Sequence, residues 1–221
     1  MGASEISVAE GYDVWASTYD EVANATRDAA MAKVRQWTAH FADKAVLEIG
    51  CGTGLNTEHL ATHAAKVTAI DLSSGMLAVA ARKFATAHVE LLQADLRAGL
   101  PGGANTYDTV IEALVLEHVE DLTPVFAETF RVLRPGGVML ACELHPYRQL
   151  LGKQARFGIG GTEVTIKAYR HSISDFANAA TDAGFRISQM EEDADISGEP
   201  RLFSLIATKP YSGTRPRMRR P

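Results

Sequence analysis

The amino-acid sequence predicts an α/β fold in which helices cover a doubly wound, mostly parallel sheet of seven strands. Short apolar runs alternate along the chain with segments of helical periodicity, and this alternation is typical of parallel strands joined by right-handed crossovers. Near the C-terminal end, two apolar runs follow each other with only a turn between them. Such a pair favours an antiparallel hairpin at the end of the sheet.

Five apolar runs are predicted to form the parallel part of the sheet, at residues 45–49, 66–70, 89–92, 108–111 and 138–144. Apolar residues with helical spacing predict helices at residues 56–65, 74–85 and 123–133. Ser73 or Ser74 can cap the second helix, because a serine side chain accepts from backbone N–H groups there. A further helix over residues 174–183 ends at Gly184, and the hairpin strands are predicted at residues 185–190 and 202–207.

The chain is expected to divide into a lid, one α/β domain and a tail. Residues 1–41, with a helix over residues 28–41, are predicted to form an N-terminal helical lid over the domain at residues 42–208. Residues 145–170 contain glycines without a clear period, which predicts an irregular cover over the substrate. The tail, residues 209–221, is basic and has too few apolar residues to fold. We expect it to be disordered, and an arm for an anionic partner is the alternative.

Charge and cysteine content narrow the functional classes. The net charge of the 221 residues is −5 although the tail is basic, so the remaining chain is acidic and unsuited to nucleic-acid phosphates. No apolar run approaches the roughly 20 residues that span a bilayer, and the N-terminus lacks the pattern of a secretory signal. Cys51 and Cys142 form neither a disulfide framework nor a zinc site. We therefore expect a cytoplasmic monomer or homodimer without a metal, a membrane anchor or a nucleic-acid partner.

A glycine-rich loop follows the first predicted strand, in the sequence VLEIGCGTG from Val46 to Gly54. Glycines at positions 50, 52 and 54 let the backbone turn tightly and approach a ligand, and the helix that follows offers unpaired N–H groups. Asp71 ends the next strand, where a carboxylate can accept from both hydroxyls of a ribose. The residues alone therefore predict a cofactor that contains a nucleoside.

The spacing of the glycines separates the classes of nucleoside cofactor. In the dinucleotide fingerprint G-x-G-x-x-G/A the third small residue would stand at position 55, which is Leu55 here. A nicotinamide-dependent oxidoreductase is therefore the less favoured alternative. The chain contains no G-x-x-x-x-G-K sequence, which argues against a Walker-type site for ATP or GTP.

Five segments resemble, in order, the motifs of the class I S-adenosylmethionine-dependent methyltransferases. They are residues 46–54, 71–76, 93–96, 107–119 and 131–138. The aromatic and acidic pattern from Tyr12 to Asp20 is similar to the lid of the branch that methylates quinones and carrier-bound esters. The resemblance implies a Rossmann-like fold, S-adenosylmethionine as cofactor and S-adenosylhomocysteine as product. It also implies in-line methyl transfer to an oxygen, nitrogen or carbon atom of a small-molecule metabolite, the alternative being an enzyme or scaffold that binds the cofactor without methylation.

The resemblance assigns roles to residues around the glycine loop. Glu48 and the three glycines would surround the methionine part of the cofactor, and Asp71 would hold the ribose. Met76 would pack on the adenine, and Asp95 would accept from the adenine amino group. The full set is Tyr19, Glu48, Gly50, Gly52, Gly54, Asp71, Leu72, Met76, Asp95, Leu96 and Glu112. Core packing of Met76, turn capping by Asp95 and anchoring of the loop by Glu48 are the structural alternatives.

Histidines near the carboxyl ends of the predicted strands are candidates for a general base. His118 follows the fourth strand and His145 the fifth, so both fall at the edge where open α/β sheets bind ligands. His171 precedes the last helix. A base is needed only if the acceptor must lose a proton, and Glu112 and Glu117 are further candidates. Hydrogen bonding to the backbone is the alternative role for each histidine.

Aromatic and cationic residues of the lid and the cover are candidates for the acceptor pocket. They are Tyr12, Trp15, Tyr147, Arg148, Arg156 and Phe157. An arginine can bind a substrate carboxylate with two hydrogen bonds, and aromatic rings can line an apolar pocket. The alternatives are solvated arginines and rings that pack the lid against the domain.

Overall fold

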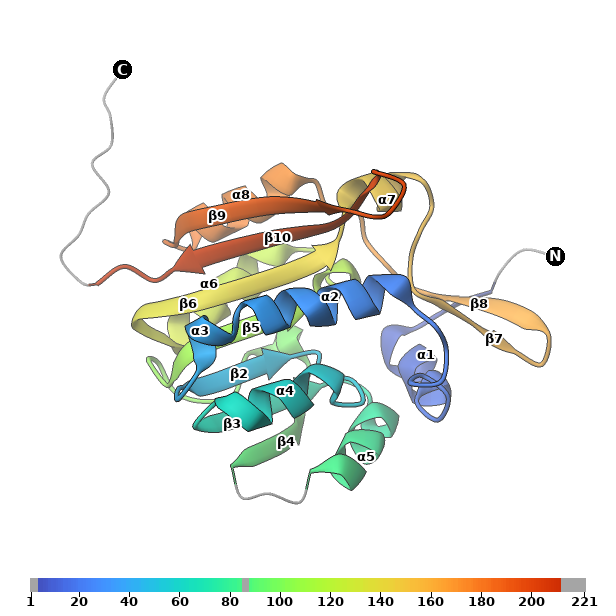
Figure 1. Ribbon diagram of the computed structural model, residues 1–221, viewed down its shortest axis with the longest axis horizontal. Coiled ribbons are helices and arrows are strands. Elements are labelled where there is room, and N and C mark those ends of the chain that lie inside the picture. Colours follow the sequence, from blue (N-terminus) through green and yellow to red (C-terminus); the bar gives the residue numbers. More distant parts are fainter. Residues whose placement is uncertain (1–3, 85–87, 212–221) are drawn as a thin grey trace.

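A seven-stranded sheet forms the centre of the computed structural model, which describes residues 4–84 and 88–211 (Figure 1). Its strands lie in the order β4-β3-β2-β5-β6-β10-β9. They are β2 (Ala45–Ile49), β3 (Lys66–Asp71), β4 (Val89–Gln93), β5 (Tyr107–Ala113), β6 (Leu133–Leu144), β9 (Arg186–Ala194) and β10 (Pro200–Thr208). The first five in this order pair in parallel, whereas β10 runs antiparallel to both β6 and β9. The predicted sheet and its C-terminal hairpin are thus confirmed.

Helices cover both faces of this sheet. One face packs against α2 (Ala25–Gln36), α3 (Thr38–Phe41) and α4 (Leu55–His63), and the other against α6 (Leu122–Val132) and α8 (Ile173–Asp182). The helix α5 (Ser74–Lys83) lies beside β3 and β4, and two short 3₁₀ turns are η1 (Leu96–Ala98) and η2 (Leu116–His118). Successive residues of β2 alternate between the faces, since Val46 packs with α2 and Leu47 with α6. None of the helices in the described residues combines the length and the apolar character needed to cross a membrane.

The predicted helix over residues 28–41 is interrupted, and it does not belong to the lid. Trp37 adopts φ −85° and ψ 6° between α2 and α3, so one helix becomes two. Val34 and Phe41 are fully buried and pack in the same cluster as Val46 of β2. These helices are therefore part of the α/β layers, because their apolar faces are buried against the sheet.

Residues 145–170 form a helix and a hairpin instead of the irregular cover expected from the sequence. α7 (Pro146–Leu150) follows β6, and β7 (Arg156–Ile159) turns into β8 (Thr162–Ile166) through Gly160 and Gly161, both with positive φ. The N-terminal strand β1 (Ser4–Ile6) pairs with β8 in parallel, so β8 has a neighbouring strand on each side. The partner comes from the other end of the chain, which explains why local sequence signals did not reveal the small sheet.

The N-terminal segment with α1 (Val8–Trp15) is attached to two loops at the carboxyl edge of the large sheet. Asp13 Oδ1 accepts from the Ser73 hydroxyl at 2.6 Å and from the Gly75 N–H at 2.8 Å, at the start of α5. Asp20 accepts from the Thr53 hydroxyl at 2.6 Å, in the loop after β2. Two carboxylates thus hold the segment over the loops that follow β2 and β3.

Lys209 begins the predicted tail but is anchored to the domain. Its Nζ donates to the carbonyls of Phe130 and Leu133, both at 2.7 Å, and its backbone N–H donates to the Gly137 carbonyl at 2.9 Å. The expectation of disorder is therefore wrong at Lys209, because three carbonyls fix it in place. Residues 212–221 lie outside the described residues.

Candidate active site

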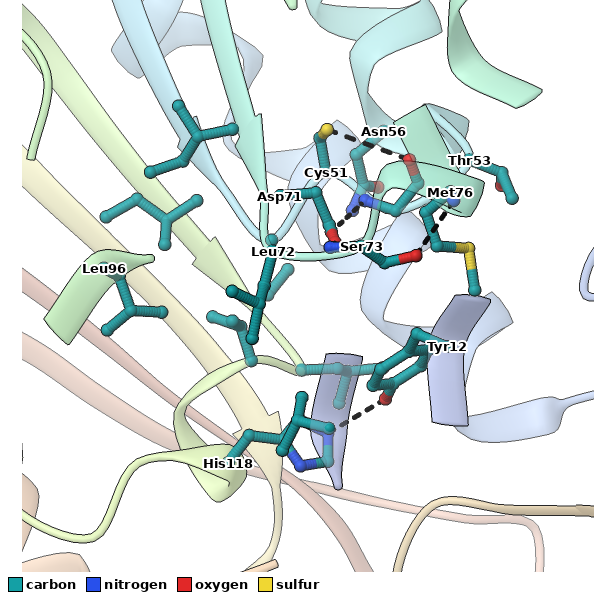
Figure 2. A pocket seen from close by; sticks show the side chains of 18 of the residues that line it. Tyr12, Cys51, Thr53, Asn56, Asp71, Leu72, Ser73, Met76, Leu96 and His118 are labelled. Carbon is teal, nitrogen blue, oxygen red and sulfur yellow. Dashed lines mark hydrogen bonds between the residues drawn. The ribbon is translucent and has the colours of Figure 1, made fainter. Parts of the chain in front are cut away.

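A cavity of about 1060 Å³, partly open to solvent, lies at the carboxyl ends of β2, β3, β4 and β5 (Figure 2). Loops after neighbouring parallel strands meet here, at the edge where open α/β sheets bind ligands. The cavity is lined by most of the residues assigned to the cofactor, namely Tyr19, Gly50, Gly52, Asp71, Leu72, Met76, Asp95 and Leu96. The fold therefore brings together residues that are far apart in the sequence.

Asp71 is held by two backbone N–H groups at the end of β3. Oδ2 accepts from the Gly52 N–H and Oδ1 from the Ser73 N–H, both at 2.8 Å. Burial raises the pKa of this carboxyl, and the two backbone hydrogen bonds oppose the effect. Each oxygen keeps a further lone pair, so the carboxylate can still accept from the two hydroxyls of a ribose.

The glycine loop forms a cradle that side chains would fill. Gly52 has φ +54°, and a Cβ added to it would meet no atom within 4 Å, although the residue lines the cavity. Gly50 has φ +72°, and a Cβ there would come within 2.7 Å of Val115 Cγ2. Because Gly52 has no side chain, a ligand can lie directly against its backbone. Such a close approach suits a cofactor that contains a nucleoside.

The opposite end of the cavity combines apolar walls with one carboxylate. Leu72 and Leu96 line it from the loops after β3 and β4, and Met76 is only 1% exposed. Asp95 caps η1 by accepting from the Arg97 N–H at 2.9 Å, and the hydrogen-bonded Arg97 guanidinium holds the pKa of Asp95 below its usual range. Flat apolar surfaces beside a hydrogen-bond acceptor fit an adenine ring.

Glu48 and Gly54 support the conformation of the glycine loop, and neither residue lines the cavity. Glu48 accepts from the Thr57 hydroxyl at 2.6 Å, and burial raises its pKa to about 8. Gly54 precedes α4 with φ +87°, where a Cβ would approach Phe84 Cε2 to 2.5 Å. In the structure, both positions help to hold the loop, and their predicted cofactor contacts stay a prediction.

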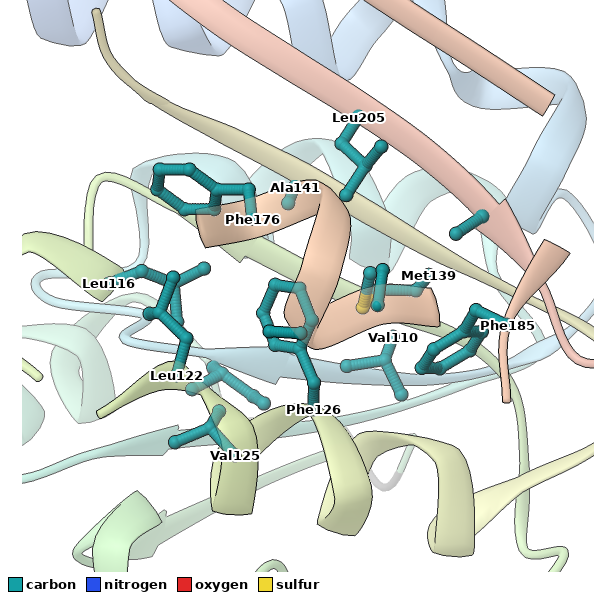
Figure 3. Close-up of a cluster of buried hydrophobic side chains, with 14 of the residues drawn as sticks. Val110, Leu116, Leu122, Val125, Phe126, Met139, Ala141, Phe176, Phe185 and Leu205 are labelled. Carbon is teal, nitrogen blue, oxygen red and sulfur yellow. The ribbon is translucent and has the colours of Figure 1, made fainter. Parts of the chain in front are cut away.

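Glu112 faces away from the cavity, in contrast to its predicted place at the cofactor edge. Figure 3 shows Val110 in the apolar cluster between the sheet and α6. Glu112, two residues further along β5, points to the same face, because side chains alternate along a strand. It accepts from the Thr129 hydroxyl of α6 at 2.9 Å, and burial raises its pKa to about 7.

A second cavity of about 980 Å³ adjoins the first and shares Tyr12, Tyr19 and Leu114 with it. The Tyr12 hydroxyl lies 2.9 Å from Nε2 of His118 (Figure 2). Nδ1 of His118 lies 2.7 Å from the Lys167 carbonyl. A carbonyl only accepts, so Nδ1 carries the ring proton and Nε2 of the neutral ring accepts from Tyr12. Among the three predicted histidines, His118 alone lines either cavity.

His145 and His171 line neither cavity, and both are held by other hydrogen-bond contacts. The Tyr147 N–H donates to Nδ1 of His145 at the start of α7, and Nε2 lies 2.7 Å from the Glu192 carboxylate of β9. Nε2 of His171 lies 2.7 Å from the Val119 carbonyl. His171 thus contacts the backbone, and His145 contacts both the backbone and the Glu192 carboxylate.

The candidate acceptor residues divide between the second cavity and its surroundings. Trp15, Arg148 and Arg156 line it, whereas Phe157 stacks behind Trp15 with ring centroids 5.1 Å apart. Tyr147 is 39% exposed and lines neither cavity. The arginines are paired with acids, since Arg148 bonds Asp195 and Arg156 lies 3.3 Å from Glu163.

Sequence reasoning missed Arg27, which reaches the cofactor cavity from α2. Its guanidinium donates to the carbonyl of Tyr19 at 2.6 Å and of Val22 at 3.0 Å. Nε is buried and has no hydrogen-bond partner within residues 4–84 and 88–211. No sequence motif identifies Arg27 as a residue of the cavity, because its position depends on how α2 packs on the sheet.

The chain is similar to known methyltransferases. A family model described as a methyltransferase domain matches residues 47–141. The chain is 32% identical to a malonyl-[acyl-carrier protein] O-methyltransferase of Priestia megaterium. The alignment spans 201 residues and covers 86% of this chain and 68% of that protein. It is 31% identical over 155 residues to a demethylmenaquinone methyltransferase of Renibacterium salmoninarum, covering 65% of this chain and 64% of that protein.

A solved structure with the same fold is the DhpI–SAH complex, with a TM-score of 0.72, 26% identity, and coverage of 91% of this chain and 95% of that one. Some relatives are longer, and the chain spans about half (51%) of the malonyl-[acyl-carrier protein] O-methyltransferase of Serratia marcescens. The glycine loop, the acidic strand end and the cavity between them agree with these similarities. The chain belongs to the class I S-adenosylmethionine-dependent methyltransferase family.

Proposed function

We propose that this protein transfers the methyl group of S-adenosylmethionine to a small-molecule acceptor, bound where the two cavities meet. The observation that carries this proposal is the pair of adjoining cavities, one with a cofactor cradle and one with polar groups beside it. Bound S-adenosylmethionine supplies a methyl group already activated by a positively charged sulfur. The residues of the chain then need to align the acceptor and keep water away.

The geometry of the cavity supports the following roles for its residues. Asp71 holds the ribose, the Gly52 backbone lets the methionine part approach, and Leu72 and Leu96 enclose the adenine. Arg27, which lines the cavity together with Tyr19, supplies a positive charge for the carboxylate of the methionine part. A cytoplasmic location, a monomer or homodimer, and the absence of a nucleic-acid partner complete the proposal, and the net charge of −5 supports the last of these.

Isothermal titration with S-adenosylmethionine and S-adenosylhomocysteine tests the cofactor. We expect micromolar binding to the unchanged protein and no measurable binding to Asp71→Ala, with Asp71→Asn in between because it keeps one acceptor oxygen. Asp182→Ala, at an exposed aspartate at the end of α8, is the control and should bind normally. Absence of binding to the unchanged protein would contradict the proposal, and analysis of labelled products separates methylation from other chemistry.

Arg27→Met is expected to weaken S-adenosylhomocysteine binding by about tenfold or more, because a hydrogen bond to a charged group contributes about 1.5–3 kcal/mol. The affinity for 5′-methylthioadenosine, which lacks the amino-acid part, should not change. Arg27→Lys should recover part of the lost affinity for S-adenosylhomocysteine. An equal loss for both ligands would show that Arg27 only supports the loop that contains Tyr19 and Val22.

A further inference from the structure

The inner end of the second cavity offers a route for a proton away from the acceptor. Tyr12 lines both cavities, so its hydroxyl lies at the boundary where an acceptor would meet the cofactor. Burial, together with nearby carboxyl groups and Tyr19, raises the pKa of Tyr12. Tyr12 therefore keeps its proton at neutral pH, and its hydroxyl is within hydrogen-bond distance of Nε2 of His118.

His118 is prepared to receive that proton. The Lys167 carbonyl holds the ring in the tautomer with a free Nε2, and Nε2 already faces the Tyr12 oxygen at 2.9 Å. A neutral histidine with a fixed tautomer is suited to act as a base near neutral pH. An acceptor whose reacting atom is already deprotonated would not need a general base.

Glu117 adds a second constraint on the acceptor. It lines the second cavity, its side chain is 8% exposed, and Oε1 lies 3.9 Å from Nε2 of His118. Burial raises its pKa, because little solvent reaches the carboxyl. The same burial makes any negative charge at this end of the cavity costly, so a carboxylate acceptor is disfavoured there, whereas an uncharged hydroxyl can hydrogen-bond to Glu117.

We propose that the reacting atom of the acceptor is the oxygen of a hydroxyl group, not of a carboxylate, and that Tyr12 relays its proton to His118. This inference rests on the proposed methyl transfer and narrows its substrate class. The acceptor O–H bond breaks and its electron pair stays on the oxygen, which attacks the methyl carbon while sulfur keeps the pair of the cleaved bond. The acceptor proton replaces the one that Tyr12 gives to Nε2, and the imidazolium later releases a proton to solvent.

The groups around His118 decide how this relay depends on pH. Tyr12 faces the ring from α1, Glu117 from its own turn and Asp71 from β3. From the segment after β8 the ring meets the Lys167 carbonyl. A negative charge that forms on either acid would stabilise an imidazolium in this position, because opposite charges attract.

Nitrogen NMR of the histidine rings, in protein saturated with S-adenosylhomocysteine, tests the first step. At neutral pH we expect His118 to carry its proton on Nδ1 and to have a bare Nε2, whose resonance moves in Tyr12→Phe. His88, whose Nε2 lies 3.0 Å from the Ala61 carbonyl, should show the opposite tautomer and serves as an internal reference. A protonated Nε2 on His118 would overturn the relay, because Tyr12 would then have no acceptor.

Turnover measurements test the substrate class with 1,4-dihydroxynaphthalene as the hydroxyl probe and malonyl-[acyl-carrier protein] as the carboxylate probe. We expect methylation of the hydroxyl probe and a drop in kcat of about 100-fold in Tyr12→Phe at pH 7, as is typical of a lost proton-transfer step. The loss should shrink as the pH rises, because an ionised acceptor needs no base, and a purely structural defect would not recover. Methylation of the carboxylate probe alone, at equal rates in both proteins, would overturn the inference.

The two proposals fail in different ways. If S-adenosylhomocysteine does not bind, the proposed function is wrong. If it binds and His118 has a protonated Nε2, or if Tyr12→Phe methylates the carboxylate probe at the unchanged rate, only the hydroxyl relay is wrong.

Discussion

Gly52→Val is expected to lower the affinity for S-adenosylmethionine by more than about 100-fold, which corresponds to about 2.7 kcal/mol. Gly52 lines the cofactor cavity, and a Cβ there would meet no protein atom within 4 Å. The space that the new side chain would enter is therefore the space that the ligand needs. The backbone N–H of Gly52 also donates to Asp71, so any shift of the loop would disturb the ribose site as well.

A matched control separates this effect from backbone strain. Gly160 has φ +55°, against +54° for Gly52, and a Cβ there would also meet nothing within 4 Å. It lies in the turn between β7 and β8, outside both cavities. Gly160→Val should therefore lose a similar amount of stability in thermal unfolding, about 1–2 kcal/mol for a β-branched residue in this conformation, and bind the cofactor normally. Equal affinities for the two variants would contradict the assignment of Gly52.

Glu143→Gln is expected to stabilise the protein at alkaline pH by about 4 kcal/mol. Glu143 is 2% exposed, and burial raises its pKa to about 8. Oε1 accepts from the N–H groups of Val115 and Leu116, both at 3.1 Å, while Oε2 is buried without a partner in the described part of the chain. In the folded protein the carboxyl therefore resists ionisation, whereas in the unfolded chain it ionises near its usual pKa.

The direction of the pH effect follows from this difference. Below about pH 4.5 the carboxyl is protonated in both states, and its contribution is fully present. As the pH rises towards 8, the unfolded chain releases its proton first, so the free energy of unfolding falls by about 1.4 kcal/mol per pH unit. Urea unfolding between pH 5 and 9 measures the loss, which should be smaller in the glutamine variant by the contribution of Glu143.

Burial also raises the pKa of four further carboxyls, those of Glu48, Asp71, Glu112 and Glu117, to about 8 for Glu48 and about 7 for Glu112. All four remain in the Glu143→Gln variant and keep part of its pH dependence. Glu90→Gln, at an exposed position on β4, is the control and should follow the unchanged protein at every pH. Parallel curves for Glu143→Gln and the unchanged protein would show that Glu143 ionises normally in the folded state.

The parallel sheet and the centre of the cofactor site were predictable because their signals are local. The strand before the glycine loop and the acid that ends the next strand are short continuous segments, and parallel pairing places both at one edge. Asp71 and Gly52 therefore follow from the sequence pattern together with the topology. The hairpin of β7 and β8 did not follow, since its third strand comes from the N-terminus.

The ring orientations of the histidines could not be predicted from the sequence. The sequence places His118 and His145 after neighbouring strands, so both reach the same edge of the sheet. Their ring orientations depend on partners that are distant in the chain, Tyr12 for His118 and Glu192 for His145. Arg27 was missed for the same reason, because only the packing of α2 brings its guanidinium to the cavity.

The residues that line the second cavity indicate how the acceptor preference of this protein can be changed. Arg148, Lys153 and Arg156 all line the second cavity and all belong to the single stretch between β6 and α8, whereas the glycine loop and Asp71 lie before it. This stretch thus supplies one wall of the acceptor cavity, and Tyr12, Trp15 and Glu117 contribute to the rest from other parts of the chain. Exchanging residues 145–172 for the corresponding stretch of a relative should transfer substrate preference while the cofactor affinity stays constant.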